Sequence, residues 1–229
     1  MLNVEAVNVS YGDSRVIHDL SFLVRPQESV AILGRNGMGK TTLLKALMGI
    51  IPTRSGRVSM QDEDITHKES YERVAKGLAF VPQGRMIFPQ LTVEENIQTG
   101  CETSSSTTIG EEVYSLFPVL FEMRRRKGGN LSGGQQQQLA IARALVSNPK
   151  VILLDEPTEG IQPSIIKDIA KVLGEVKRTM QIAFVVSEQM LSFALDIADR
   201  ILIIEKGAVV HEEERQRVDI DKVKQYLTV

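Results

Sequence analysis

The segment from Gly34 to Thr42 reads Gly-Arg-Asn-Gly-Met-Gly-Lys-Thr-Thr and matches the pattern G-x-x-x-x-G-K-[ST]. Glycines let the backbone of such a loop curl so that its N–H groups point at phosphate oxygens. Lys40 then reaches the β- and γ-phosphates of a nucleotide, and the Thr41 hydroxyl supplies a ligand to Mg²⁺. The sequence therefore predicts a nucleotide site whose contacts come from Gly34, Asn36, Gly37, Gly39, Lys40, Thr41 and Thr42.

Two adjacent carboxylates, Asp155 and Glu156, follow the apolar run Val151–Leu154. In open α/β sheets, ligands bind at the carboxyl ends of the strands. Asp155 is suited to orient Mg²⁺ and its waters, and Glu156 to polarise a water that attacks the γ-phosphate. Taken alone, Asp155 could equally cap a helix. Beside a phosphate-binding loop, the metal and catalytic roles are the better interpretation.

The segment Leu131–Gln135 places two glycines directly before a long helical pattern. Backbone N–H groups at a helix N-terminus form an anion site, here predicted at Ser132, Gly133, Gly134 and Gln135. A chain with one nucleotide rarely needs two such sites. We therefore expect the second site to serve the nucleotide of a partner subunit.

Short runs of Val, Ile and Leu must position these residues. Most of the runs are apolar throughout, which indicates strands that are buried on both faces of a parallel sheet covered by helices. The sequence therefore predicts an α/β core. The expected strands are Ser29–Leu33, Leu78–Val81, Val151–Leu154, Ile182–Val186 and Ile201–Ile204.

The N-terminal part follows a different pattern. Asn3–Ser10 and Val16–Val24 alternate apolar and polar residues, and Gly12-Asp13 between them is typical of a hairpin turn. This predicts an antiparallel β layer attached to the core and extended by Gly56–Met60.

The interval from about 86 to 146 is predicted to be a helical subdomain, because strand patterns disappear there. Helices are expected at Val93–Thr99, with Thr92 and Glu95 as a capping box, and at Glu111–Met123. The Ser/Thr-rich stretch Thr103–Thr108 between them is predicted to be an exposed linker. A charged tail is expected from about 211 to 229, with a short helix from about Asp219.

Composition limits the function classes further. The 229 residues include 27 Lys and Arg against 29 Asp and Glu, a formal net charge of −2, which lacks the basic excess of a nucleic-acid binder. One cysteine, Cys101, excludes an intramolecular disulfide framework and fits a reducing compartment. No apolar run approaches the roughly 18 residues that span a bilayer. We expect a cytoplasmic protein that reaches a membrane only by docking to another protein.

The order and spacing of these motifs resemble the ATP-binding subunits of ABC transporters over nearly the whole chain. The resemblance implies a single ATPase domain over residues 1–229, with a P-loop NTPase (RecA-like) core that binds ATP and Mg²⁺. It also implies that Tyr11 stacks on adenine, that Gln83 contacts Mg²⁺ and signals to a membrane subunit, and that Leu131–Gln135 is the family signature. The implied partners are a second ATPase subunit, membrane permease subunits and, indirectly, a substrate-binding protein. The two ATPase subunits are expected to form a heterodimer, with a homodimer as the alternative for the isolated subunit.

Longer segments are similar to those of the importers for urea and short-chain amides, which are relatives of the branched-chain amino acid importers. These segments are Gly37–Thr42, Val81–Pro89, Gly133–Arg143 and Asp155–Asp168. The resemblance implies import of urea or amides by a transporter with two different ATPase subunits. Branched-chain amino acids are the alternative cargo.

Two residues depart from the general family pattern. Gln162 stands where most members have an aspartate, and Gln189 where a histidine usually follows the strand. Glutamine can donate to a γ-phosphate oxygen, but it cannot carry a proton. A non-enzymatic, nucleotide-gated scaffold therefore stays open as an alternative, although Glu156 argues against it. A soluble ABC protein acting on DNA or ribosomes is less consistent, because each motif occurs only once.

Overall fold

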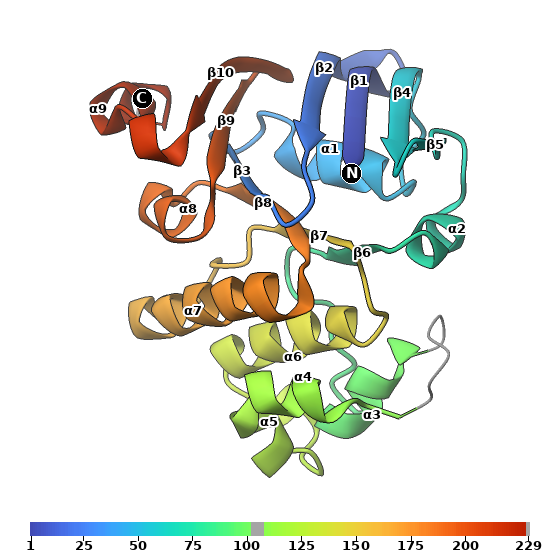
Figure 1. Cartoon of the computed structure of the whole chain (residues 1–229), viewed down its shortest axis with the longest axis vertical. Helices are drawn as coiled ribbons and strands as arrows, with labels where there is room; N and C mark the ends of the chain where they lie inside the picture. The colour runs from blue at the N-terminus through green and yellow to red at the C-terminus, as the bar shows by residue number, and fades with distance from the viewer. Residues whose placement is uncertain (102–107, 228–229) are drawn as a thin grey trace.

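The computed structural model describes residues 1–101 and 108–227. It contains two β-sheets and the helix α1 (Lys40–Leu47) (Figure 1). Both sheets and α1 contribute buried side chains to one hydrophobic cluster. Leu43, Leu44 and Leu47 on one face of α1 are fully buried among side chains of both sheets. Burial of each such side chain is worth about 1.5–3 kcal/mol. The helix that follows the phosphate-binding loop is thus fixed between the two layers.

The larger sheet has the strand order β10-β9-β3-β8-β7-β6 and is parallel except for its β10 edge. Every residue of β3 and β7 is buried, which is why these strands read as continuous apolar runs. The predicted α/β core is therefore confirmed. Its strands are β3 (Ser29–Leu33), β6 (Leu78–Val81), β7 (Val151–Asp155), β8 (Ala183–Glu188), β9 (Arg200–Glu205) and β10 (Ala208–Glu214).

The smaller sheet is antiparallel, with the order β2-β1-β4-β5, and confirms the predicted N-terminal layer. Tyr11 pairs with Ser14, so Gly12 and Asp13 form the expected two-residue turn. The strands are β1 (Leu2–Tyr11), β2 (Ser14–Val24), β4 (Ser55–Met60) and the short β5 (Glu63–Asp64).

Helices occupy the interval in which strand patterns were absent: α3 (Val93–Gln98), α4 (Glu111–Leu116), α5 (Pro118–Glu122), the 3-10 turn η2 (Gly128–Asn130) and α6 (Gly133–Leu145). The capping box of Thr92 and Glu95 opens α3 as predicted. A single helix over Glu111–Met123 was wrong. The chain breaks at Phe117, because Pro118 has no N–H to continue the first helix and instead starts the second. The predicted linker lies outside the described residues except for Thr108.

The remaining helices cover the parallel sheet or its edges: α2 (Ser70–Ala75), α7 (Pro163–Met180), α8 (Leu191–Ile197), the 3-10 turn η3 (Arg215–Arg217) and α9 (Ile220–Leu227). The predicted tail from 211 is wrong in its first residues, because β10 pairs with β9 up to Glu214. The terminal helix expected near Asp219 is present. Among the residues described, no helix is both long and apolar enough to cross a membrane. The division into one ATPase domain with a helical subdomain at 86–146 stays a prediction.

Candidate functional site

The phosphate-binding loop leaves the buried end of β3 at Leu33 and enters α1 at Lys40. Gly39 caps this helix at φ +101°, a left-handed conformation that favours glycine. A Cβ at this position would also lie 2.8 Å from Cδ1 of Ile17 on β2. The loop is therefore held between the two sheets at a point where no larger residue fits.

Lys40 is 4% exposed, and its partners among the described residues lie within the loop and directly after β7. Its Nζ donates to the carbonyl oxygens of Gly34, at 2.8 Å, and Arg35, at 3.1 Å. The same atom lies 3.1 Å from Oε1 of Glu156. The predicted phosphate lysine and the predicted catalytic carboxylate are thus in direct contact.

Asp155 ends β7 and is also buried. Its Oδ1 accepts hydrogen bonds from the hydroxyls of Thr41, at 3.0 Å, and Ser187, at 2.6 Å. Oδ2 is buried without a hydrogen-bond partner in the described part of the chain. Burial raises the pKa of this carboxyl, while the two hydroxyl donors oppose the rise. A free carboxylate oxygen beside a threonine hydroxyl fits a Mg²⁺ ion, which takes oxygen ligands.

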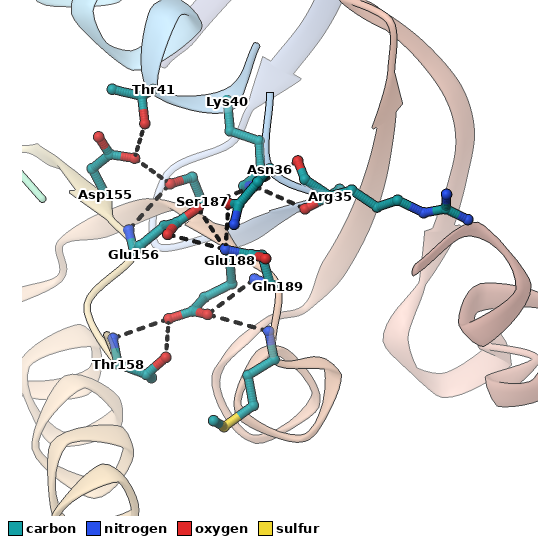
Figure 2. A network of polar contacts seen from close by, with 12 residues as sticks. Arg35, Asn36, Lys40, Thr41, Asp155, Glu156, Thr158, Ser187, Glu188 and Gln189 are labelled. Carbon is teal, nitrogen blue, oxygen red and sulfur yellow. Dashed lines mark hydrogen bonds and ion pairs between the residues drawn. The ribbon is translucent and has the colours of Figure 1, made fainter. Parts of the chain in front are cut away.

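Glu156 has a left-handed backbone with φ +46°, which is uncommon for a residue with a side chain. Its N–H donates to the carbonyl oxygen of Ser187, at 3.0 Å, which ties the turn after β7 to β8. Figure 2 shows Gln189 beside the carboxylate: its Nε2 donates to both oxygens of Glu156, at 3.1 Å, and to Oδ1 of Asn36, at 2.8 Å. Strained backbone of this kind clusters at active sites.

Glu188 is a buried carboxylate that the sequence analysis missed. Its Oε1 accepts from the N–H and the hydroxyl of Thr158, at 3.1 and 2.7 Å, and its Oε2 from the N–H groups of Gln189 and Met190, at 3.0 and 3.3 Å (Figure 2). Burial raises the pKa of Glu188 above its ordinary value against the pull of these four donors. The side chain joins the turn that carries Glu156 to the turn that carries Gln189.

A cavity of about 220 Å³ lies over these residues and is lined by Val16, Asn36, Gly37, Gly39, Lys40, Thr41, Thr42, Gln83 and Glu156. Gln83 also lines a second cavity, with Asn36, Glu156, Glu188 and Gln189. The structure thus brings Gln83 to the predicted phosphate and metal residues. Val16 was missed, because an apolar residue in a strand carries no signal of its own.

Two groups of predicted residues lie elsewhere. Tyr11 is 52% exposed at the β1–β2 turn and does not line either cavity. Ser132 and Gln135 form a capping box at the start of α6, while Gly133 lies against Arg85 and Gly134 against Ile165. Their roles in nucleotide binding stay predictions. Gln162 is exposed and precedes α7 without capping it by its side chain.

In this chain a glycine-rich loop joins the buried parallel strand β3 to a helix that begins with Lys-Thr, and two carboxylates stand at the end of β7 of the same sheet, with β8 between the two strands. This arrangement defines a P-loop nucleoside triphosphatase. Residues 17–159, well over half of the chain, match the family model described as ABC transporter. The chain belongs to the ABC transporter family.

Two relatives and one solved structure narrow this assignment. The chain is 39% identical to the high-affinity branched-chain amino acid transport ATP-binding protein BraG of Pseudomonas aeruginosa, over 92% of this chain and 91% of that one. It is 32% identical to the probable branched-chain amino acid transport ATP-binding protein LivF of Archaeoglobus fulgidus, over 91% and 90%. The ATP-binding cassette MJ0796, solved as a dimer in a post-hydrolysis state with ADP and Pi, has a TM-score of 0.83 at 26% identity, over 94% and 99%. The chain is therefore the ATP-binding and ATP-hydrolysing subunit of an ABC importer.

Proposed function

We propose that this subunit powers the import of branched-chain amino acids. The observation that carries the proposal is the 39% identity to BraG across nine-tenths of both chains, supported by the similarity to LivF. The expected cargo of urea or short-chain amides has no support in these comparisons, which favour the alternative instead.

The chemistry we propose follows from the contacts around Lys40. A bound γ-phosphate would compete with Glu156 for the Lys40 ammonium, because both are anions that approach the same Nζ atom. Glu156, released from Lys40, is then free to accept a proton from, or to orient, the attacking water. Retention of this carboxylate beside Lys40 favours an ATPase over the non-enzymatic scaffold.

We propose that Thr41, Asp155 and Gln83 hold Mg²⁺. Asp155 offers the buried, unpartnered Oδ2, and Gln83 lines the same cavity as Thr41. When bound, the ion neutralises charge that develops on the phosphate oxygens. Thr41 and Ser187 keep the Asp155 carboxylate oriented by donating to its other oxygen.

We propose that two ATPase subunits form the working unit, with Ser132, Gly133, Gly134 and Gln135 completing the partner's nucleotide site. Within this chain, Gly133 lies against Arg85 and Gly134 against Ile165 rather than against the phosphate-binding loop. The dimeric state of MJ0796 supports the proposal. We propose no nucleic-acid partner, in keeping with the net charge of −2.

We further propose that a helical segment of the membrane permease docks in an apolar groove of about 620 Å³ between α2, β6 and α6. Its lining includes the exposed side chains of Ile50, Met86 and Phe88. Pro82, next to Gln83, lines the same groove, which would place docking beside the nucleotide site. The subunit would then act as a peripheral protein at the cytoplasmic face of the membrane.

The proposed function is tested by reconstituting this subunit with its permease, its second ATPase subunit and the binding protein in liposomes. We expect ATP hydrolysis to rise when leucine, isoleucine or valine is supplied, and labelled leucine to accumulate. Urea and acetamide are supplied in parallel experiments as the competing cargo class. Stimulation by urea or acetamide, with no response to the three amino acids, would contradict this proposal and support urea or short-chain amides as the cargo.

A further inference from the structure

Arg73 in α2 is a buried arginine, only 2% exposed, that lies outside the nucleotide site. All its hydrogen bonds within the described residues go to backbone carbonyl oxygens. Nε donates to Lys68 at 2.9 Å, Nη2 to Thr66 at 2.8 Å, and Nη1 to Ala46 and Leu47 at 2.9 and 2.7 Å. A guanidinium placed in this way holds together segments that have no backbone pairing with each other.

The carbonyls of Ala46 and Leu47 belong to the last turn of α1. The other end of the same helix carries Lys40 and Thr41. An α-helix of this length extends about 12 Å and moves as a rigid rod. A positive charge at the carboxyl end also complements the helix dipole. Arg73 therefore fixes the C-terminal end of α1, whose N-terminal end carries the predicted phosphate and Mg²⁺ residues Lys40 and Thr41.

Residues next to both partners of the contact between Arg73 and α1 line the proposed permease groove. Ser70 and Val74 of α2 line the groove, as do Met48 and Ile50, which follow α1. Between them, Gly49 has φ +78°, and a Cβ there would lie 2.8 Å from Nε of Arg73. The chain thus passes directly over the guanidinium as it turns from α1 into the groove wall.

We propose that Arg73 is a positioning residue that makes α1 and the groove wall move as one body, so that permease binding at the groove acts on the phosphate-binding end of α1. This inference rests on the proposed function, because it takes the permease as the occupant of the groove. It adds a route of coupling between the permease and the nucleotide site that does not pass through Gln83. Donors that reach both α1 and the segment before α2 are essential to this role.

The test compares Arg73→Lys and Arg73→Met in the reconstituted transporter. Methionine has a similar length but donates no hydrogen bond, and lysine keeps the charge with a compact ammonium that cannot span all four carbonyls. We expect ATP affinity of the isolated subunit and its unstimulated ATPase rate to change by less than about twofold. Stimulation by the permease with loaded binding protein should fall by about fivefold or more in Arg73→Met, a typical size for coupling between sites. Arg73→Lys should retain an intermediate stimulation.

The fall should lie in kcat, with KM for ATP unchanged, because the nucleotide contacts themselves remain. Lys76→Met is the matched control: it removes a cation from the end of the same helix, where the Lys76 ammonium pairs with the exposed Glu63. If Arg73→Met does not fold, Arg73→Lys carries the test. Full stimulation in Arg73→Lys, or a rise in KM that accounts for the whole loss, would overturn the inference. Absence of stimulation in the wild-type complex would overturn the proposed function instead.

Discussion

Glu156 shares its carboxylate between Lys40 and Gln189, so its chemistry depends on which partner holds it. The Lys40 ammonium is 3.1 Å from Oε1, and the Gln189 amide donates to both oxygens. The Lys40 ammonium places a positive charge beside this carboxylate. The amide of Gln189 orients that carboxylate without contributing a charge.

The contrast between Lys40 and Glu156 gives the first prediction. Lys40→Ala should abolish ATP binding, because the phosphates lose their buried cation. Glu156→Gln should bind ATP but hydrolyse it about 10²- to 10⁴-fold more slowly, since the base acts mainly in the transition state. Equilibrium binding of a fluorescent ATP analogue and single-turnover phosphate release check the pair. Unchanged single-turnover hydrolysis in Glu156→Gln would remove Glu156 from its proposed role.

Glu188 gives a second prediction at the same scale. Glu188→Gln places an amide N–H₂ against at least one backbone donor, so about 1–3 kcal/mol of the free energy of unfolding should be lost. We expect kcat to fall while KM for ATP stays the same, because the turns of Glu156 and Gln189 lose their common anchor. Urea denaturation and steady-state kinetics measure the two effects. Glu159→Gln, in an exposed neighbour, is the control and should leave both unchanged.

At the scale of elements, the pair Glu28 and Arg200 joins the start of β3 to the start of β9. Arg200 donates through Nε at 2.9 Å and Nη2 at 3.1 Å, and both side chains are 8% exposed. Burial favours the neutral acid, but the hydrogen bonds from Arg200 and from the N–H of Arg25 outweigh it and hold the pKa of Glu28 below its ordinary value. This contact fixes the register of the central strand that leads into the phosphate-binding loop.

The lowered pKa sets the direction of a pH effect. Glu28 contributes stability above the ordinary carboxyl pKa of about 4.3, and this contribution is lost as pH falls through the lower value of the folded state. Glu28→Gln should cost about 3 kcal/mol near neutral pH, because Arg200 stays buried with fewer acceptors. The difference from wild type should shrink toward pH 3. Denaturation at several pH values measures it, with the exposed Glu214→Gln as control; a difference independent of pH contradicts the assignment.

The elements also show which features a sequence can predict. The phosphate-binding loop and Asp155 are contiguous patterns with fixed local geometry, so residue order alone located them. The break before Pro118 was equally local, and the missing N–H of proline was the available signal. Glu188 and Arg73 could not be found in this way. Their roles depend on partners such as Thr158 and Ala46, which are distant in sequence and meet only after the sheet has formed.

For the whole molecule, the position of Ser132 away from the phosphate-binding loop leads to a prediction about two subunits. If Ser132 completes the partner's site, Ser132→Arg harms the partner's nucleotide, whereas Glu156→Gln harms the site on this chain. Gln189 offers only neutral donors, which stabilise developing charge less than an ionised group does. We expect this chain's site to be the slower one, so Ser132→Arg should reduce ATP turnover more than Glu156→Gln does. Both variants are measured in the same reconstituted transporter at saturating ATP; equal losses, or a larger loss from Glu156→Gln, contradict a weaker Gln189 site.

The same placement of Ser132 and Gly134 has a kinetic consequence. When a site is assembled from two chains, its concentration depends on the encounter of those chains. At protein concentrations well below the dissociation constant of the dimer, ATPase velocity of the purified subunit should rise with the square of its concentration, and specific activity should fall on dilution. Attachment to a permease removes that dependence, because it keeps two ATPase subunits at a fixed high effective concentration. We therefore expect energy release to be confined to assembled transporters, with dispersed subunits leaving cellular ATP largely untouched.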